Sequence, residues 1–217
     1  MSRKRVAILI SGRGSNMAAL IDAAKAADYP AAVALVVSNR PDAAGNEVAR
    51  RQGVATVVLD HRPFGKDRAA FEQALQAILD EHRIEIVCLG GFMRLFTNDF
   101  VLRWHGRMLN IHPSLLPAFK GLDPHGQALG AGVKIAGATV HFVTPAMDAG
   151  PIVAQAAVAV AEDDTAETLA ARVLAVEHRL YPLALKLVAQ GRVRIVDGRC
   201  RIDGAEQAGG SLVNPPA

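Results

Sequence analysis

Short apolar segments rich in β-branched residues alternate with longer, alanine-rich segments over the first 90 residues of the chain. The apolar segments, which are predicted to be strands, are 6–10, 32–38, 55–60 and 85–89. The segments between them, which are predicted to be helices, are 15–27, 42–52 and 67–82. In the last helix, Phe71, Leu75 and Ile78 recur at helical spacing on one face. Such alternation is typical of βαβ units, which build a parallel sheet covered by helices on both faces.

The pattern changes after residue 90, where longer strands and one long helix are predicted. The predicted strands are 108–111, 134–143 and 152–160, and the predicted helix is 165–190. Asp164 and Glu167 form a capping-box pattern at the start of that helix. Asp197-Gly198 predicts a hairpin between 193–196 and 199–202.

These elements predict an α/β fold of three layers, with a mostly parallel sheet and a Rossmann-like N-terminal half. We expect one domain over residues 1–204, because no linker or internal repeat interrupts the pattern. The Gly- and Pro-rich tail, 205–217, is expected to be disordered.

The composition excludes several classes of protein. Cys88 and Cys200 are the two cysteines, too few for a disulfide framework, and neither has metal ligands at zinc spacing. No apolar run is long enough to span a membrane. A net charge of +3 is too small, and an aromatic content of 5% too low, to indicate nucleic-acid binding. We therefore expect a cytoplasmic protein that binds small molecules and no metal, nucleic acid or membrane. A monomer and a homodimer are both left open, because the sequence does not specify the oligomeric state.

A glycine-containing loop, Ser11-Gly12-Arg13-Gly14-Ser15-Asn16, joins the first predicted strand to the first predicted helix. The free N–H groups and positive dipole at a helix start suit an anion such as phosphate. A simple tight βα turn is the alternative. NAD is disfavoured because Met17 replaces the third glycine of the dinucleotide pattern and no acidic residue ends the second strand. An NADP-dependent oxidoreductase remains an alternative, since Arg40 could meet a 2′-phosphate.

The most promising chemical group lies near the middle of the chain. Asn110 and His112 stand two apart on a predicted strand, so their side chains leave the same face. An amide and an imidazole together can stabilise one oxyanion, and the imidazole can move a proton. Asp148, in a Gly- and Pro-rich loop, is the proposed partner of His112, although it could instead form a turn. A purely structural His112 is a further alternative, and His125 or His141 could also face the site.

Five segments resemble a known family in their order along the chain: SGRGSN, GGFMRLF, NIHPSLLPAFKG, HFVTPAMDAGPIVAQ and EHRLYP. The family is that of the glycinamide ribonucleotide formyltransferases, the folate-dependent transformylases of purine synthesis. The resemblance extends from about Arg5 to Val196. It implies the formyltransferase fold and transfer of a formyl group from 10-formyltetrahydrofolate, the co-substrate, to the amine of glycinamide ribonucleotide through a tetrahedral oxyanion.

The same resemblance implies a set of site residues. The catalytic residues it implies are Asn110, His112 and Asp148. The ribonucleotide would be bound by Gly14, Ser15, Asn16 and Glu177. The folate site it implies consists of Arg68, Met93, Arg94, Leu95, Phe96, Asn110, Thr144, Pro145, Ala146, Met147 and Asp148. No metal is implied.

One segment departs from the family pattern. The family usually carries GLHTHRQAL, whereas this chain has GLDPHGQAL, so Asp123 replaces a histidine and Gly126 replaces an arginine. Within the superfamily, a formyltetrahydrofolate hydrolase and a methionyl-tRNA formyltransferase remain alternatives. The first usually carries an extra N-terminal domain and the second a C-terminal one. Because Met1 stands close to the first predicted strand and few residues follow Ile202, we expect neither.

Overall fold

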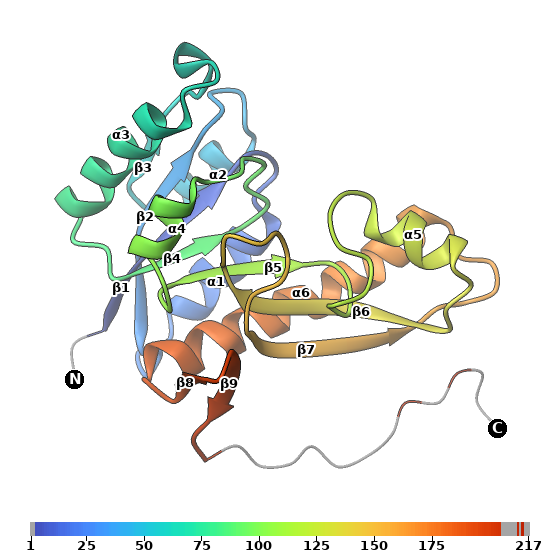
Figure 1. Ribbon diagram of the computed structural model, residues 1–217. Helices are drawn as coiled ribbons and strands as arrows, with labels where there is room; N and C mark the ends of the chain where they lie inside the picture. The colour runs from blue at the N-terminus through green and yellow to red at the C-terminus, as the bar shows by residue number, and fades with distance from the viewer. Residues whose placement is uncertain (1–2, 205–211, 213, 215–217) are drawn as a thin grey trace. The chain divides into compact units, whose positions relative to one another are not determined.

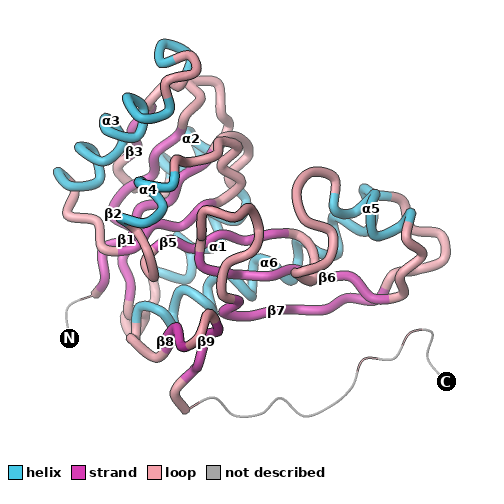
Figure 2. The backbone as a smooth tube through the Cα atoms, viewed as in Figure 1, coloured by secondary structure: helices cyan, strands magenta, loops and turns pink. Residues whose placement is uncertain are grey.

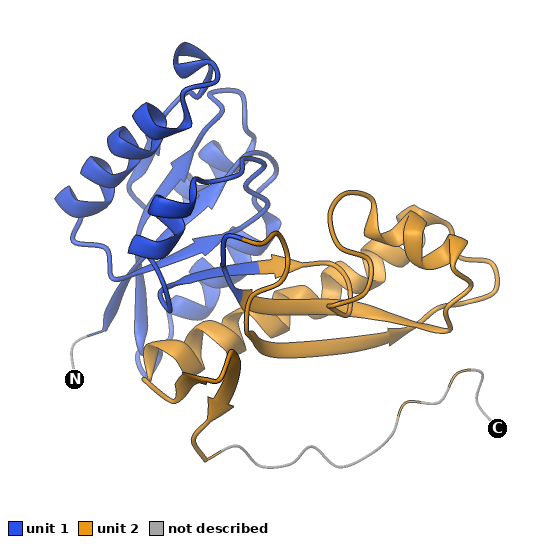
Figure 3. Cartoon of the chain, viewed as in Figure 1, with its two compact units in different colours: residues 1–110, 142–145 blue, residues 111–141, 146–217 orange. Residues whose placement is uncertain are grey.

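We describe a computed structural model, which covers residues 3–204, 212 and 214. The chain divides into two compact units, drawn in different colours in Figure 3. Unit 1 contains residues 1–110 and 142–145, and unit 2 contains 111–141 and 146–217. The expected disorder of 205–217 falls almost wholly outside the described residues.

The strands form a seven-stranded sheet in the order β3-β2-β1-β4-β5-β6-β7 (Figure 1). The first five strands in chain order are β1 (Lys4–Ile10), β2 (Ala31–Ser38), β3 (Thr56–Val58), β4 (Ile86–Leu89) and β5 (Met108–His112). They pair in parallel, whereas β6 (Ile135–Phe142) and β7 (Ile152–Ala159) pair antiparallel. The predicted α/β class with a mostly parallel sheet is therefore confirmed.

Helices connect the parallel strands of unit 1. They are α1 (Ser15–Ala24), α2 (Gly45–Arg51), the short 3₁₀ helix η1 (Arg62–Phe64), α3 (Arg68–Glu81) and α4 (Asn98–Arg103). Alternate strand residues such as Leu9, Leu35 and Val87 pack with Phe71 of α3 and Phe100 of α4 in one buried cluster. Since successive strand residues face opposite sides of a sheet, the intervening residues form the second face.

That second face carries α1 and α2. Gly90 lies close to both Ile8 and the Met17 backbone of α1, and Gly45, which begins α2, lies against Ile10. Helices thus cover both faces of the strands of unit 1, the expected three-layer arrangement.

Unit 2 is built on the β6–β7 hairpin, whose two long strands are traced in magenta in Figure 2. Its other elements are α5 (Pro124–Gly130), α6 (Ala166–Ala189), β8 (Val193–Val196) and β9 (Arg199–Ile202). Helix α6 packs on β7 and on α5. The predicted hairpin at Asp197-Gly198 is confirmed, and both residues have the positive φ that such a turn requires.

Several details differ from the sequence-based expectation. Helix α2 begins at Gly45 rather than at residue 42, and β3 covers Thr56–Val58 rather than 55–60. Helix α1 ends at Ala24 rather than at residue 27, and α4 and α5 were not predicted. The capping box of α6 is formed by Thr165 and Thr168, not by Asp164 and Glu167. Within the described residues, no helix is both long and apolar enough to cross a membrane.

Candidate active site

His112 and Asp148 lie in contact in unit 2. His112 is the last residue of β5, and Asp148 lies in the loop between β6 and β7. The imidazole Nδ1 is 3.5 Å from Asp148 Oδ2, and both side chains are about nine-tenths buried. Asp148 adopts a left-handed φ of 48°. A buried carboxylate beside an imidazole fixes the orientation of the ring.

The other ring nitrogen of His112 faces a carbonyl. Nε2 lies 2.9 Å from the backbone oxygen of Phe119, which can only accept a hydrogen bond, so Nε2 carries a proton in this arrangement. The loop that presents this carbonyl is tied to the hairpin. Thr139 Oγ1 donates to Ser114 O and accepts from Leu116 N, and Gln155 Nε2 donates to both Leu116 O and Thr139 Oγ1.

Asp148 has two further partners in unit 2. The N–H of Gly121 donates to Oδ2 at 3.0 Å, and His141 Nε2 lies 3.8 Å from Oδ1. His141 is 2% exposed, so this second histidine faces the carboxylate and not solvent. Sequence reasoning left His141 as one of several possibilities. The signal that could have singled it out is its place in a buried strand immediately before the Asp148 loop.

Asn110, the third expected catalytic residue, is the β5 residue paired with Leu89 of β4. It is half-buried and two positions from His112, with Ile111 between them. Ser114, which also follows β5, uses its hydroxyl to donate to Ala118 O at 2.6 Å. Because that hydroxyl is committed to a carbonyl, Ser114 is poorly placed as a nucleophile.

The predicted anion loop begins α1 in unit 1. Gly14 is the N-cap residue, with a left-handed φ of 72°, and it supplies no capping side chain. The first turn of the helix contains no acidic residue. A Cβ at Gly14 would lie 3.2 Å from Gly45 Cα, so glycine also allows the loop to pack closely against the start of α2. The backbone geometry and the missing acid both favour an anion at this end.

The segment 93–96, expected to bind folate, alternates between exposed and packed side chains. Met93 and Leu95 are 69% and 64% exposed. Arg94 instead lies over the ring of Phe71 at 4.9 Å, and Phe96 stacks on neighbouring rings. Only two of the four side chains therefore present apolar surface to a ligand, while Arg94 and Phe96 anchor the segment.

The remaining expected residues are divided between the units. Unit 1 contains Arg68, the exposed first residue of α3, together with Thr144 and the exposed Pro145. Unit 2 contains Ala146 and Met147, which are exposed, and Glu177, which is 5% exposed in the middle of α6. The structure establishes contact among the expected catalytic residues only for His112 and Asp148.

A chain of hydrogen bonds in unit 1 was missed by sequence reasoning. The N–H of Met93 donates to Ser11 Oγ at 2.8 Å, and that hydroxyl donates to Asn39 Oδ1 at 2.6 Å. His61 Nδ1 in turn lies 2.8 Å from Asn39 O. Ser11, Asn39 and His61 follow β1, β2 and β3, so the chain crosses the carboxyl ends of three parallel strands. Ligands of open α/β sheets bind at this edge.

Comparison with known proteins decides the family. The formyl transferase family pattern matches residues 4–185. The phosphoribosylglycinamide formyltransferase of Escherichia coli K12 is 42% identical over 92% of this chain and 93% of its own length. The chain belongs to the formyl transferase family.

Other relatives agree with this membership. The crystal structure of glycinamide ribonucleotide transformylase 1 from Symbiobacterium toebii is 48% identical, with a TM-score of 0.89 over 92% of this chain and 94% of that chain. The trifunctional purine biosynthetic protein adenosine-3 of Bos taurus is 50% identical over 89% of this chain. The chain spans about a fifth (19%) of that protein's length. The family resemblance inferred from the motifs is thus confirmed.

Asp123 and Gly126, which depart from the expected family pattern, lie together at the start of α5. Asp123, at a left-handed φ of 53°, accepts a hydrogen bond from Gly126 N at 3.1 Å and so caps the helix. A Cβ at position 126 would overlap this carboxylate and lie 2.8 Å from its Cγ. Two of the three departures from the expected family pattern, Asp123 and Gly126, are therefore physically coupled. Burial lowers the pKa of the neighbouring His125, and Asp123 opposes this effect.

In the part of the chain that the structure describes, no group of three or more His, Cys, Asp or Glu side chains is arranged to hold a metal ion.

Proposed function

We propose that this protein transfers the formyl group of 10-formyltetrahydrofolate to the amine of glycinamide ribonucleotide, a reaction of purine synthesis. The observation that carries the proposal is the buried contact between His112 and Asp148 in a member of the formyl transferase family. His112 follows Asn110 by two residues on the same strand. Formyl-folate supplies the activated one-carbon group. The names of the relatives support the purine substrate.

Asn110 and His112 would act on the oxygen of the transferred formyl group. When the amine attacks, negative charge develops on that oxygen, and the Asn110 amide can donate a hydrogen bond to it. The His112 imidazole, oriented by Asp148, stabilises the same charge and moves a proton toward the departing nitrogen. Since Nε2 of His112 is engaged by the Phe119 carbonyl, this contact must be exchanged for the substrate during the reaction.

The ribonucleotide and the folate differ in chemistry, and different residues of the chain suit each of them. The Gly14, Ser15 and Asn16 backbone at the start of α1 suits the ribonucleotide phosphate, and the Glu177 carboxylate suits its amine or ribose. The exposed Met93 and Leu95 offer apolar contact for a pterin, with Arg68 for the anionic end of the folate. Residues 144–148 complete the proposed folate site.

The proposal includes the setting in which the protein works. It would be a cytoplasmic enzyme with one domain over residues 1–204, acting on small molecules as a monomer or homodimer and without a metal. The formyl transferase family offers no support for the alternative NADP-dependent oxidoreductase.

A spectrophotometric assay tests the proposal. The protein is incubated with 10-formyl-5,8-dideazafolate and glycinamide ribonucleotide, and each is omitted in turn. Release of the deformylated folate only when the ribonucleotide is present is the expected result. Release without the ribonucleotide would identify a hydrolase, and no release in either case would contradict the proposal.

A further inference from the structure

The start of α2 supports the loop that precedes α1 in unit 1. Gly45, the first residue of α2, donates its N–H to the carbonyl oxygen of Gly12 at 3.0 Å. Gly45 is buried, and its Cα would lie only 3.2 Å from a Cβ at Gly14. Gly45 therefore contacts the loop that is proposed to bind the ribonucleotide phosphate without belonging to it.

A side chain at position 45 would collide with this loop. An ideal Cβ there would lie 2.6 Å from Ile10 Cδ1, 2.9 Å from the Gly12 oxygen and 3.3 Å from the Arg13 oxygen. Ile10 Cδ1 is the end of a flexible side chain and can move away. The two oxygen atoms belong to the backbone, so they can move only if the loop itself changes conformation. The close approach of α2 to the loop therefore requires glycine at position 45.

The contact with Gly45 also fixes the direction of two N–H groups of the loop. The Gly12–Arg13 and Arg13–Gly14 peptide bonds are trans, and in a planar trans peptide the C=O and N–H groups point in opposite directions. Because both carbonyl oxygens face Gly45, the N–H groups of Arg13 and Gly14 point away from α2. Among the described residues, no backbone carbonyl accepts from either N–H. Both donors are therefore available to an anion at the start of α1.

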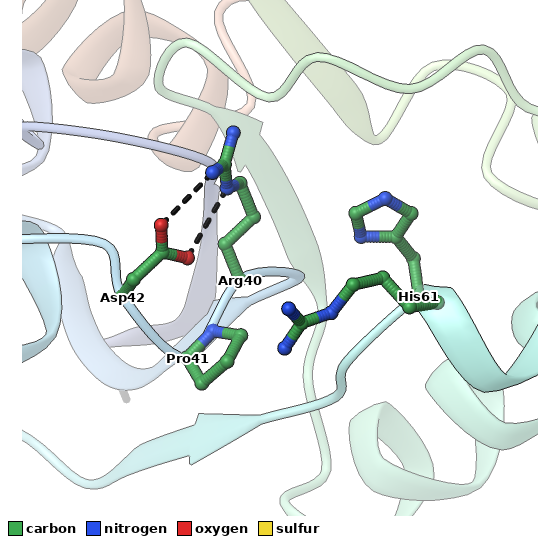
Figure 4. A pocket seen from close by; sticks show the side chains of 5 residues that line it. Arg40, Pro41, Asp42 and His61 are labelled. Carbon is green, nitrogen blue, oxygen red and sulfur yellow. Dashed lines mark hydrogen bonds and ion pairs between the residues drawn. The ribbon is translucent and has the colours of Figure 1, made fainter.

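The connection between β2 and α2, which holds Gly45 in place, is itself well ordered by hydrogen bonds. Asn46 is 2% exposed, and its Nδ2 donates to Arg40 O at 3.0 Å and to Pro41 O at 3.2 Å. In the pocket shown in Figure 4, Arg40 Nη2 also lies 2.9 Å from Asp42 Oδ2. A framework that is ordered before binding loses less conformational entropy when a ligand binds.

From this arrangement we propose that Gly45 is a positioning residue for the ribonucleotide. Through the Gly12 carbonyl, Gly45 directs the N–H groups of Arg13 and Gly14 toward the phosphate. The proposal rests on the proposed function for the identity of that ligand. Gly45 itself touches neither substrate. Because hydrogen bonds weaken steeply when the donor is misaligned, a rotation of these peptides weakens phosphate binding and leaves the folate site unchanged.

The first test is the Gly45→Ala variant in steady-state kinetics. We expect the KM for the ribonucleotide to rise about tenfold or more, while kcat and the KM for formyl-dideazafolate stay within about twofold of the wild type. Gly130→Ala is the matched control, because a methyl group at this helical glycine of α5 would meet nothing within 4 Å. An unchanged ribonucleotide KM in Gly45→Ala, or an equal rise of both KM values, would overturn the proposal.

A double variant separates positioning of the loop from packing of the core. Ile10→Val removes the Cδ1 atom that an alanine at position 45 would crowd, but it leaves the collision with the Gly12 oxygen. Ile10→Val/Gly45→Ala should therefore melt close to the temperature of Ile10→Val alone, and its ribonucleotide KM should remain about tenfold higher than that of Ile10→Val. Recovery of the KM together with the melting temperature would show that Gly45 acts only through packing, which would overturn the proposal.

A binding measurement separates failure of this proposal from failure of the proposed function. Glycinamide ribonucleotide and the corresponding riboside, which lacks the phosphate, are titrated calorimetrically into the wild-type protein and into Gly45→Ala. The wild type should bind the ribonucleotide about 100-fold more tightly than the riboside, and Gly45→Ala should reduce this ratio about tenfold. That result supports the role of Gly45 even if no formyl transfer is found. An equal ratio in the two proteins, or no preference for the ribonucleotide in the wild type, would overturn the proposal even if formyl transfer occurs.

Discussion

Asp148 combines an unfavourable backbone conformation with several polar partners. A non-glycine residue in the left-handed region is uncommon, and such residues cluster at functional sites, where the surroundings hold them. Here the Gly121 N–H, His112 and His141 all approach the Asp148 carboxylate. The hairpin loop thus presents the carboxylate in one orientation, with one oxygen toward each histidine.

At this residue scale, His112→Ala should lower kcat by about 10²- to 10³-fold, because it removes a group that acts chiefly on charge in the transition state. The KM for the ribonucleotide should change by no more than a few-fold. Steady-state kinetics measure both values. His105→Ala, at an exposed histidine, is the control. A kcat close to that of the wild type would remove His112 from the catalytic step.

The coupling between Asp123 and Gly126 gives a second residue-scale prediction. In the wild-type background, Asp123→Ala should lower the free energy of unfolding by about 1 kcal/mol or more through loss of the cap. In a Gly126→Ala background the added methyl already displaces the carboxylate, so the same substitution should cost about 1 kcal/mol less. Urea denaturation of the four proteins gives the coupling energy. Strict additivity would show that the cap and the glycine are independent.

At the scale of elements, Asp164 stabilises the connection between β7 and α6 through its hydrogen bonds. It accepts hydrogen bonds from Arg172, from the Ala161 N–H and from Thr168 Oγ1. The Arg172 hydrogen bonds, followed by those from Ala161 and Thr168, hold the pKa of this carboxyl well below its ordinary value. A depressed pKa in the folded protein means that the stabilisation is present above the unfolded pKa, near 4, and is lost as the pH falls further.

Asp164→Asn should therefore lower the melting temperature at pH 7, where the carboxylate is charged in both folded and unfolded chains. The difference in melting temperature between Asp164→Asn and the wild type should become smaller as the pH falls below about 4. Thermal melting across pH 2–7 measures this, with Asp22→Asn as an exposed control. A constant difference at every pH would exclude an electrostatic origin.

The start of α1 offers another element-scale prediction. Ser15→Asp places a negative charge in the first turn, where a carboxylate stabilises the helix dipole, so the folded protein should be no less stable. The same charge repels a phosphate, and ribonucleotide affinity should fall about tenfold or more while folate affinity is unchanged. Calorimetric titration of each ligand distinguishes the two effects, with Ser15→Asn as the uncharged control. Equal loss for both ligands would contradict a phosphate site here.

Long periodic elements were predictable from the sequence, and short ones were not. The period of Phe71, Leu75 and Ile78 located α3 to within a residue or two, because that helix buries one whole apolar face. Helix α4, with six residues, is too short to establish a period. The capping box of α6 was misassigned because Asp164 forms its strongest contacts with Arg172, a partner that spacing does not reveal.

In the candidate site, too, some features could be predicted from the sequence and others could not. The motif resemblance implied Asn110, His112 and Asp148 as a set, and the contact between His112 and Asp148 agrees with the pairing that was proposed from the sequence. The chain from Met93 through Ser11 to Asn39 depends on which strands are neighbours in the sheet. No local pattern specifies that neighbourhood, so these contacts appear only once the fold is known.

At the scale of the whole molecule, β5 is shared between the two compact units, with Met108–Asn110 in one and Ile111–His112 in the other. Because the units share a strand, we expect them to unfold as a single cooperative domain. Differential scanning calorimetry should show one transition, with equal calorimetric and van't Hoff enthalpies. Two resolved transitions would contradict the single-domain expectation.

The packing of Gly126 against Asp123 also constrains the order in which this sequence and the family pattern could interconvert. An ideal Cβ at position 126 would lie 2.3 Å from Asp123 Oδ2, so a side chain there would force the carboxylate to move from its capping position. A lineage that reaches the present pair must acquire glycine first if aspartate is to be of immediate use to the helix. We therefore expect substitutions at positions 123 and 126 to be epistatic in their effect on this seven-residue helix: the value of one depends on whether the other is present.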